Sequence, residues 1–584
     1  MENRDVARIL RETAQLLQVD GAIIGRYRSY EKAAELIESL PESVAELAKD
    51  EEKLQDLPGI GERMAEHIRE ILKTGKYSTL TKLLKKYPHT LLDILRLQGL
   101  GPKKVAFLWS NFKAATVDDI ERLAREQKLR DLPGFGEKTE ENILRAVEVF
   151  KKSTGRYHIH VVEELAEQLI AHARAYGKQV ESVEPAGSLR RGRETVGDLD
   201  LLLTLSSVKH SQKDVDAVAD HVVRFPGVDQ VLARGENKVS FRLNAGIQVD
   251  VRLLEKKNFG AALLYFTGSK EHNVALRSRA LKMGYTLNEY ALSAVKGERR
   301  VAGATEEEIY AKLDLAVPPP EIREHTGEIE AAAENRLPKL VELGDIRGDL
   351  QMHTTASDGK HSIEEMAAAA RELGYEYIAL TDHSKAVTVA NGLDEKRTLA
   401  QIKKIRAAEK GAGIRLFAGS EVDILKDGKL DLDDDVLAQL DVVVCSIHSF
   451  MNLDRAAMTD RMLAAIENPH TQIIGHPTGR QLLRRDGFDY DMERIFDAAA
   501  KRSVALECNA FPDRLDLKDT YLRMARDRGV KIVISTDAHS TTNLRYMKYG
   551  VRMARRGWLE KKDVLNTLPA DSFLKALRRP GGLR

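Results

Sequence analysis

Residues 187–203, GSLRRGRETVGDLDLLL, place two carboxylates, Asp198 and Asp200, at the start of an apolar run. The composition of the run predicts a buried strand, and side chains alternate along a strand. The two aspartates therefore face the same way, with Cα atoms roughly 6.6 Å apart at ~3.3 Å per residue. Two carboxylates this close repel each other unless a proton or a cation lies between them. Taken alone, an Asp-x-Asp pair is more often two solvated acids at a strand end than a metal site.

Three neighbouring features favour the metal site. The stretch 247–254, IQVDVRLL, alternates as a strand and puts Asp250 on its polar face, where it offers a third carboxylate. Gly187 and Ser188 open a turn whose backbone N–H groups and hydroxyl suit phosphate oxygens, and Arg191 adds a forked, charge-assisted contact. A hard divalent cation takes carboxylate and phosphate oxygens together, which is the chemistry that this combination predicts.

Length and composition limit the possible classes of protein. At 584 residues the chain has room for about four domains of ~150 residues each. A net charge of +1 means that any nucleic-acid surface must be local. The two cysteines, Cys445 and Cys508, are expected to be free thiols, and the charged start MENRDVARIL has no signal core. No apolar stretch approaches the ~18 residues of a membrane span. We therefore expect a soluble cytoplasmic protein.

Three segments near the N-terminus repeat one pattern: LPGIGERMAEHI from Leu57, LQGLGPKKVAFL from Leu97 and LPGFGEKTEENI from Leu132. Each is a Gly-x-Gly turn that opens an amphipathic helix, and the three resemble helix-hairpin-helix motifs. One such turn alone more often closes a tight helix pair than binds DNA. With three copies we expect at least one to bind the DNA backbone, and the second, with Lys103 and Lys104, is the first choice. The third is acidic and is expected to be structural. The candidate DNA-binding glycines are Gly59, Gly61, Gly99, Gly101, Gly134 and Gly136.

The motifs GSLRRGRETVGDLD, VDVRLL and LLYFTGSKEHNVALRSRALKMGYTLNEYAL together resemble the nucleotidyltransferase core of the family X DNA polymerases, the DNA polymerase beta relatives. With the hairpins, the resemblance covers roughly residues 1–317. It implies that two Mg²⁺ (or Mn²⁺) ions are held by Asp198, Asp200 and Asp250. It implies triphosphate contacts from Arg156, Ser188, Arg191 and the Gly197 backbone. The sugar pocket would be formed by Tyr265, Phe266 and Gly268, and the minor-groove contacts by Asn273 and Arg277. Simple core packing is the alternative for the two adjacent aromatics.

The chain departs from this family at one position of the first hairpin. Members with 5′-deoxyribose phosphate lyase activity carry a Schiff-base lysine where this sequence has His67. An imidazole does not form the required iminium, so we expect weak or absent lyase activity by that route.

A second pattern begins after the proline run AVPPPEI (316–322), which predicts a linker. Seven short apolar runs separated by helical segments each end in residues able to bind metal, as strands of a βα barrel do at their C-terminal ends. Glu507 and Asn509 lie on the sixth run. His361 and His470 fall outside the pattern and are expected at the surface. Any one strand-end histidine is more often a core residue than a ligand, but the set argues for a multinuclear metal centre.

This half resembles the PHP (polymerase and histidinol phosphatase) domain, with STDAHS and GHPTGR as specific signatures. The resemblance implies a distorted seven-stranded barrel that hydrolyses phosphoesters with two or three divalent ions, Mn²⁺ first and Zn²⁺ next. Gln351 stands where many members have histidine, which would weaken the hold on one metal. The implied ligands are His353, Asp358, His383, Glu421, His448, His476, Asp537 and His539.

The sequence therefore predicts a multidomain α and α/β chain in six parts. Residues 1–88 form a helical lyase-like domain with the first hairpin, and 89–152 a helical DNA-binding subdomain with the other two. Residues 153–256 form a nucleotidyltransferase palm and 257–317 a subdomain that binds the nascent base pair. Residues 318–344 are a linker, and 345–584 form a distorted (β/α)7 PHP barrel.

The predicted activity is that of a prokaryotic family X DNA polymerase that fills short gaps in DNA repair. Its PHP domain is expected to act as a 3′–5′ exonuclease, with 3′-phosphatase or abasic-site endonuclease activity as further options. Gapped or primer-template DNA and dNTPs are the expected partners of a monomeric, nucleoid-associated protein. Two alternatives stay open: a metal-dependent nuclease whose polymerase half only positions DNA, and a non-enzymatic DNA-binding scaffold.

Overall fold

The computed structural model describes residues 1–577 except 2, 41–42, 56, 58, 98, 154 and 207–210. The chain divides into two units, Met1–Thr154 with Leu483–Asp486, and Gly155–Leu482 with Gly487–Arg584. In the described part of the chain, no helix is both long enough and apolar enough to span a lipid bilayer.

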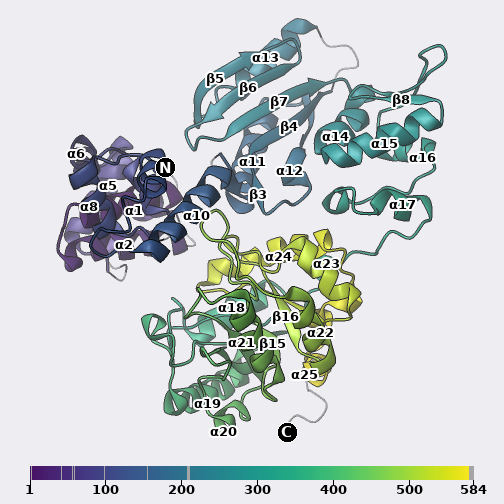
Figure 1. Ribbon diagram of the computed structural model, residues 1–584. Coiled ribbons are helices and arrows are strands. Elements are labelled where there is room, and N and C mark those ends of the chain that lie inside the picture. The colour runs from purple at the N-terminus through teal and green to yellow at the C-terminus, as the bar shows by residue number, and fades with distance from the viewer. Residues whose placement is uncertain are drawn as a thin grey trace. The chain divides into compact units, whose positions relative to one another are not determined.

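The first unit is helical (Figure 1). Its apolar residues recur every three to four positions, so each helix buries one face; α5 buries Met64, Ala65, Ile68 and Ile71. Its helices are α1 (Asn3–Val19), α2 (Ile24–Ser39), α3 (Val44–Leu47), α4 (Glu51–Gln55), α5 (Glu62–Thr74), α6 (Ser78–Lys86), α7 (Leu91–Leu95), α8 (Pro102–Phe112), α9 (Val117–Arg125) and α10 (Glu137–Ser153).

The predicted hairpins are present in this unit. Gly59, Gly99 and Gly134 have φ angles of +86°, +90° and +80°, which glycine adopts without the strain of a side chain. Gly61 and Gly101 then cap the N-termini of α5 and α8 in extended conformation. Each turn therefore presents free backbone N–H groups at the start of a helix.

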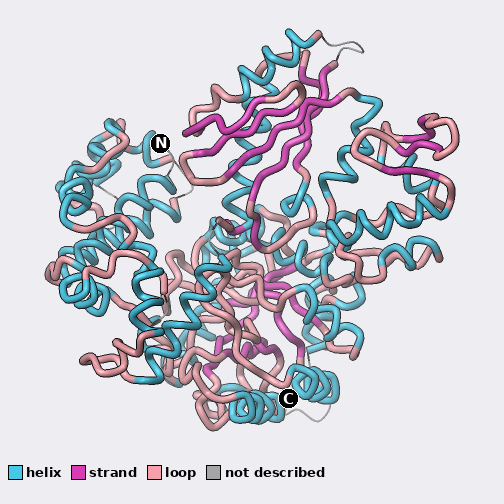
Figure 2. The backbone as a smooth tube through the Cα atoms, turned by 45° about the horizontal axis from the view of Figure 1, so that its top comes forward, coloured by secondary structure: helices cyan, strands magenta, loops and turns pink. Residues whose placement is uncertain are grey.

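The second unit begins with a five-stranded mixed sheet in the order β2-β4-β7-β6-β5. Figure 2 shows its strands running side by side. The helices α11 (Ile159–Arg174) and α13 (Gln212–Val222) pack in one hydrophobic cluster with Leu199, Leu201 and Leu203 of β4. The strands are β2 (Val180–Pro185), β4 (Asp198–Leu205), β5 (Val228–Arg234), β6 (Lys238–Leu243) and β7 (Gln248–Leu254), and a small ladder joins β1 (Tyr157–His158) to β3 (Thr195–Val196).

A smaller subdomain follows the sheet along the chain. It contains α14 (Phe259–Thr267), α15 (Lys270–Lys282), α16 (Glu306–Lys312) and the antiparallel strands β8 (Tyr285–Leu287), β9 (Leu292–Ala294) and β10 (Arg300–Ala302). Glu306 of this subdomain forms an ion pair with Arg190, which lies in the turn before β4. The Glu306 carboxylate accepts two hydrogen bonds from Arg190, at 3.0 and 2.8 Å, and two from Arg323, at 2.5 and 3.1 Å. Arg323 is 1% exposed, so this ion network is buried.

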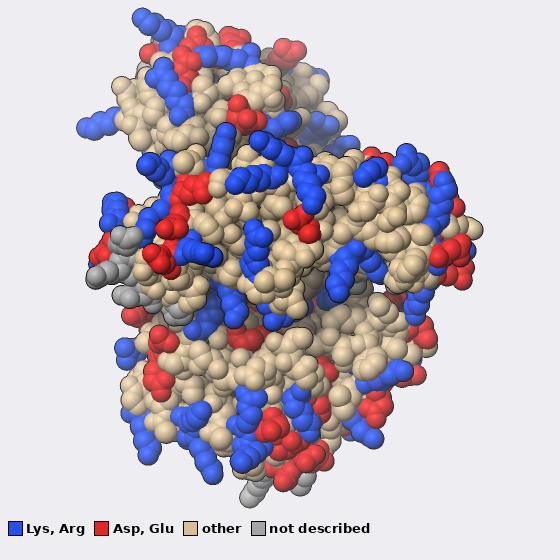
Figure 3. Space-filling view, turned by 90° about the vertical axis from the view of Figure 1, so that its left-hand side faces the viewer, with Lys and Arg blue, Asp and Glu red and all other residues tan. Residues whose placement is uncertain are grey.

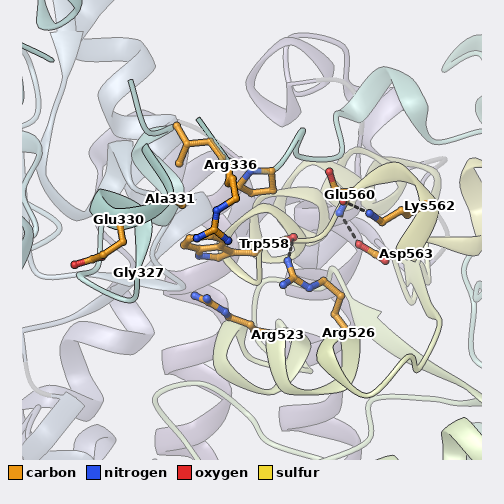
Figure 4. Close-up of a pocket in the computed structure, with 12 residues that line it drawn as sticks. Gly327, Glu330, Ala331, Arg336, Arg523, Arg526, Trp558, Glu560, Lys562 and Asp563 are labelled. Atoms are coloured by element: carbon orange, nitrogen blue, oxygen red, sulfur yellow. Dashed lines mark hydrogen bonds and ion pairs between the residues drawn. The ribbon is translucent and has the colours of Figure 1, made fainter. Parts of the chain in front are cut away.

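The segment predicted as a linker, 318–344, holds short helical turns and packs on both of its neighbours. It contains η2 (Pro320–Ile322), α17 (Glu328–Ala333) and η3 (Leu343–Asp345). The buried Glu328 carboxylate lies 2.6 Å from His272 Nδ1 in α15. On its other side the segment borders a polar cavity of about 550 Å³. There Arg523 lies over the Trp558 ring at 4.0 Å, and Gly327, Glu330 and Ala331 line the same cavity (Figure 4). The domain boundaries themselves stay predictions.

The last part of the chain is a seven-stranded parallel sheet whose strands follow one another in sequence order. A parallel bridge between Met352 and Ala538 joins its two ends, so the sheet curls into a nearly closed barrel. The predicted seven strands and barrel architecture are confirmed. The strands are β11 (Gly348–Asp349), β12 (Tyr377–Leu380), β13 (Arg415–Asp423), β14 (Val442–Ser446), β15 (Ile473–Ile474), β16 (Ala505–Asn509) and β17 (Ile532–Ser535). The helices between and after them are α18 (Ile363–Glu372), α19 (Glu395–Ala412), α20 (Asp434–Leu437), α21 (Arg455–Glu467), α22 (Met492–Arg502), α23 (Asp519–Asp527), α24 (Met547–Arg556) and α25 (Ala570–Leu577).

The buried Glu306 network predicts a pH-dependent loss of stability. Burial alone would raise the pKa of Glu306, but Arg190 and Arg323 lower it from 4.5 to about 2. Glu306→Gln should lower the free energy of unfolding by about 3 kcal/mol at pH 7, because it leaves two arginines without a carboxylate. A carboxyl with a depressed folded pKa stabilises fully above pH 4.5, and the stabilisation fades as the pH falls toward 2.

Urea unfolding of the full-length protein at pH 7 and pH 4 measures this difference, with the exposed Glu307→Gln as the matched control. A Glu306→Gln deficit equal to that of Glu307→Gln, or one that grows as the pH falls, contradicts the prediction.

Candidate functional site

The first candidate site lies on the palm sheet. Asp198 and Asp200 stand at the N-terminal end of β4, and Asp200 is the register partner of Asp250 on the parallel strand β7. Leu199 and Leu201 point toward α11 and α13, so the alternating aspartates occupy the opposite face of the sheet. The fold thus brings the three predicted carboxylates to one edge of two adjacent strands.

The electrostatics of this edge suit a cation. Burial, and then the neighbouring Asp198 and Asp250, raise the pKa of Asp200 to about 7. Lys238 Nζ lies 2.7 Å from Asp250 Oδ2 and helps to keep the pKa of that carboxyl low. Gly187, at φ +59°, closes over Asp200: a Cβ there would meet Asp200 Oδ2 at 2.8 Å. The three carboxylates therefore carry more negative charge than their protein neighbours offset, which is what a divalent ion requires.

The predicted triphosphate residues border this edge. Arg156 donates to Thr195 Oγ1 at 2.8 Å and to Thr195 O at 2.6 Å, and its guanidinium lies against Gly197. Ser188 follows Gly187 in the short helix α12 (Gly187–Arg190). Arg191 is mostly buried: its Nε donates to Glu324 Oε1 at 3.0 Å and its Nη1 to Thr267 O. Arg191 therefore already has a carboxylate partner within the protein.

The predicted sugar-pocket residues lie at the end of α14. The Tyr265 and Phe266 rings meet edge to face at 5.1 Å, and the Arg252 guanidinium lies over Phe266 at 4.0 Å. Gly268 packs against the Arg191 guanidinium. In α15, the Asn273 amide donates to Tyr265 O at 2.7 Å, whereas Arg277 is exposed. The two aromatic rings are half-buried. Core packing, the alternative role for them, therefore leaves part of each ring exposed.

The hairpins differ in the charge that they present. Lys103 is exposed at the start of α8, and Lys104 donates to Gly99 O at 3.2 Å while it lies over the Phe135 ring. In the third hairpin, Glu140 is buried and accepts from the backbone N–H groups of Leu129 and Arg130, which is a structural role. On the face drawn in Figure 3, Lys and Arg side chains lie among Asp and Glu rather than in one unbroken patch.

His67, at the position of the family's lyase lysine, packs in an aromatic cluster of the first unit. Its ring is parallel to that of Tyr30 at 5.6 Å, and Tyr30 Oη bonds Tyr77 Oη at 2.8 Å. Burial lowers the pKa of His67, so the neutral imidazole prevails at pH 7. The weak or absent lyase activity expected by this route stays a prediction.

The second candidate site lies at the C-terminal ends of the barrel strands. His353, His383, His448 and His476 follow β11, β12, β14 and β15, Glu421 stands on β13, and Asp537 and His539 follow β17. Because parallel strands end at one rim, these side chains meet there, with Asp358 added from the loop after β11. All of them except the fully buried His353 line a cavity of about 220 Å³, together with Val387, Val389, Ala390 and Arg514.

Potential ligand atoms at this rim form three groups, and any two of the groups have one residue in common. Within each group the atoms lie within 4.8 Å of one another. Glu421 is central: its carboxylate oxygens lie 3.4 Å from His353 Nε2, 3.2 Å from His383 Nδ1, 3.3 Å from His448 Nε2 and 2.9 Å from His476 Nε2. The groups are His353, Asp358, His383 and His539; His383, Glu421 and His448; and His353, Glu421 and Asp537.

Several of these atoms have unmet bonding capacity. His353 Nδ1, His383 Nδ1 and Glu421 Oε2 are buried and have no hydrogen-bond partner among the described residues. Burial acts to raise the pKa of Glu421, yet the imidazoles around it hold that pKa well below its usual range. Buried imidazole and carboxylate atoms that point at common spaces are the donor set of a divalent transition metal, so the residues fit the expected ions.

Gln351 follows β11 two residues before His353. It is fully buried, and neither atom of its amide has a hydrogen-bond partner within the described chain. A Cβ on Gly475 would lie 3.3 Å from Gln351 Oε1, which places the amide beside the strand end that carries His476.

Two residues of this rim were not predicted from the sequence, and one histidine elsewhere in the barrel was misplaced. Asp423 accepts from His448 Nδ1 at 3.0 Å and orients that ring; its spacing of two from Glu421 on one strand was the available signal. Arg514 lines the cavity, with Nε 3.5 Å from Asp537 Oδ2. The expectation that His470 lies at the surface was wrong, because it is buried at 8% exposure.

Comparison with known families matches five segments of the chain. Residues 160–237 match the DNA polymerase beta palm and 262–324 the DNA polymerase beta thumb. Residues 1–77 match a helix-hairpin-helix domain, and 91–148 a SAM-like helix-hairpin-helix tandem. Residues 349–511 match the PHP domain.

One relative spans the whole chain. The DNA polymerase/3'-5' exonuclease PolX of Bacillus subtilis (strain 168) is 38% identical over 581 residues, which cover 98% of this chain and 100% of that protein. This chain belongs to the PolX family. PolX proteins thus join a family X polymerase to a PHP domain, as both candidate sites indicate.

Other relatives match about a third of this PolX chain. A probable phosphatase of Thermoanaerobacter sp. (strain X514) is 28% identical over 38% of this chain and 89% of its own length. A probable phosphatase of Acetivibrio thermocellus is 30% identical over 33% of this chain and 78% of its own length.

The shared position of Glu421 predicts an unequal loss of metal from variants of the barrel. Glu421→Gln should remove metal from two groups, whereas Asp358→Asn should affect one, because Asp358 belongs to a single group. His470→Asn is the control, a buried barrel histidine outside all three groups. Mass-spectrometric metal analysis of protein dialysed first with and then without Mn²⁺ measures the content. Wild-type content in Glu421→Gln would rule out the arrangement.

Proposed function

We propose that this PolX chain fills short gaps in DNA and hydrolyses DNA from 3′ ends, with one active site in the palm and one in the barrel. The observation that carries the polymerase half is the meeting of Asp198, Asp200 and Asp250 on adjacent strands beside a phosphate-binding turn. The full-length likeness to a DNA polymerase/3'-5' exonuclease supports both halves.

In the palm, Asp198, Asp200 and Asp250 hold two divalent ions, Mg²⁺ or Mn²⁺. When bound, such ions lower the pKa of a primer 3′-hydroxyl and offset the charge on the leaving pyrophosphate. Arg156, Ser188, Arg191 and the Gly197 backbone bind the triphosphate. Tyr265, Phe266 and Gly268 shape the sugar pocket, and Asn273 and Arg277 contact the nascent pair.

In the barrel, the eight ligands from His353 to His539 hold two or three ions, with Mn²⁺ first and Zn²⁺ second. Such ions supply a hydroxide and polarise a phosphoester. Asp423 keeps the His448 ring turned toward Glu421. The likeness to probable phosphatases supports a 3′-phosphatase activity beside the exonuclease, since both reactions cleave a phosphoester at a 3′ end.

Separate sites predict separable activities. Asp198→Ala should reduce dNTP incorporation on gapped DNA about 1,000-fold, because a metal contributes several kcal/mol to the transition state, and should leave 3′-end hydrolysis intact. His353→Ala should do the reverse. Both assays run on the same 3′-labelled and gapped duplexes with Mg²⁺ or Mn²⁺. The two-site proposal is wrong if one substitution abolishes both activities, and the polymerase half is wrong if wild type incorporates nothing.

The hairpins predict a contact with the DNA backbone. Lys103→Glu should weaken binding of gapped duplexes of any sequence and reduce the salt slope of log K by about 1, as the loss of one phosphate contact does. Lys138→Glu is the matched control, because Lys138 holds the same position in the acidic third hairpin and is also exposed. Fluorescence anisotropy across a salt series gives both quantities. Equal effects of the two substitutions would contradict the choice of the second hairpin.

A further inference from the structure

One arginine of the barrel reaches the phosphate-binding turn of the palm. Arg556 ends α24, and its side chain is 1% exposed. Its Nη1 donates to the backbone carbonyl of Arg191 at 2.9 Å and to Glu324 Oε1 at 3.0 Å. Its Nη2 donates to Asp519 Oδ2 of α23 at 2.5 Å. A side chain from the PHP part of the chain thus bonds the residue proposed to bind the triphosphate.

Glu324 is shared between two guanidinium groups. Arg191 Nε donates at 3.0 Å to the same Oε1 that accepts from Arg556. Arg193 adds a third positive charge at 3.7 Å. A carboxylate bound to Arg191 competes with a triphosphate for that guanidinium, and each further cation on the carboxylate weakens the competition.

The contact between Arg556 and Arg191 is one of several polar contacts along one face of α24. Lys548 Nζ lies 2.7 Å from the Glu163 carboxylate of α11, and Tyr549 Oη donates to the same group at 2.8 Å. Arg555 Nε lies 2.6 Å from Glu321 Oε1 in the segment after α16. These positions follow the 3.6-residue period, so one helix face of the barrel supports the palm and the exit from the thumb. Within that face, Arg556 touches Arg191 and Arg555 does not.

We infer that Arg556 is a positioning residue for nucleotide incorporation: it anchors the Arg191 backbone and offsets the charge of Glu324, leaving the Arg191 guanidinium available for the triphosphate. The inference rests on the proposed polymerase function. It makes nucleotide binding in the palm depend on a residue of the hydrolase part, without any contact between Arg556 and the reacting atoms.

The test is steady-state gap filling by the full-length protein with the dNTP concentration varied. Arg556→Met should raise the KM for dNTP about tenfold, the effect expected for one lost bond to a charged group, and should change kcat less than about threefold. Arg556→Lys should recover part of the loss, because it restores a cation beside Glu324. Arg555→Met is the matched control and should leave the KM unchanged. Unchanged 3′-end hydrolysis in all three variants shows that the barrel is folded.

A second variant covers the case in which Arg556→Met loses hydrolysis and is therefore misfolded. Glu324→Gln removes the competing carboxylate charge and should lower the KM for dNTP about threefold. A wild-type KM in folded Arg556→Met, an equal rise in Arg555→Met, or an unchanged or raised KM in Glu324→Gln overturns the inference. Absence of incorporation by wild type contradicts the proposed function instead, so the two failures are distinguishable.

Discussion

Acidic side chains form a close cluster in two places in this chain. Each cluster is stable only when positive charge lies beside its carboxylates. In the palm, Lys238 supplies it for Asp250, while Asp200 is left with a pKa of about 7. In the barrel, His353 and His448 supply it, because the carboxylates around them raise the pKa of both imidazoles to about 9. Burial disfavours a charged His353, yet Asp537 and Glu421 raise its pKa to about 9. Divalent ions would replace both the protons and the missing charge.

The palm and the barrel are unrelated folds, but both bring acidic side chains together through the regular geometry of β-strands. In the palm, alternation along β4 and the register with β7 put three carboxylates on one face while the leucines between them pack against helices. In the barrel, seven parallel strands end at one rim, and six of them place a predicted ligand there. The rest of the fold packs apolar side chains behind these edges.

Local periodicity explains what could be predicted from the sequence. Asp198 and Asp200 share a face because the side-chain period of a strand is two, and the glycine hairpins are visible because their spacing repeats. Most of the predicted barrel ligands stood out because they lie at the ends of apolar runs. Asp423 also obeys the strand period, but its role depends on the rotation of the His448 ring, which no pattern encodes.

Long-range ion pairs explain what could not be predicted. Prolines 318–320 exclude a regular helix or strand, but they carry no information about packing, and the segment after them buries Arg323 against Glu306. Glu324 lies 133 positions from Arg191, and Arg556 lies 232 positions from Glu324. Such pairs have no period, so the coupling between the palm and the barrel becomes visible only once the chain is folded.

The most direct measurement is anomalous diffraction at the manganese edge from crystals of the full-length protein grown with Mn²⁺. The account predicts peaks bounded by Asp198, Asp200 and Asp250, and further peaks around Glu421 within the three barrel groups. Peaks absent from either place, or an Asp250 side chain turned away from Asp200, would contradict it.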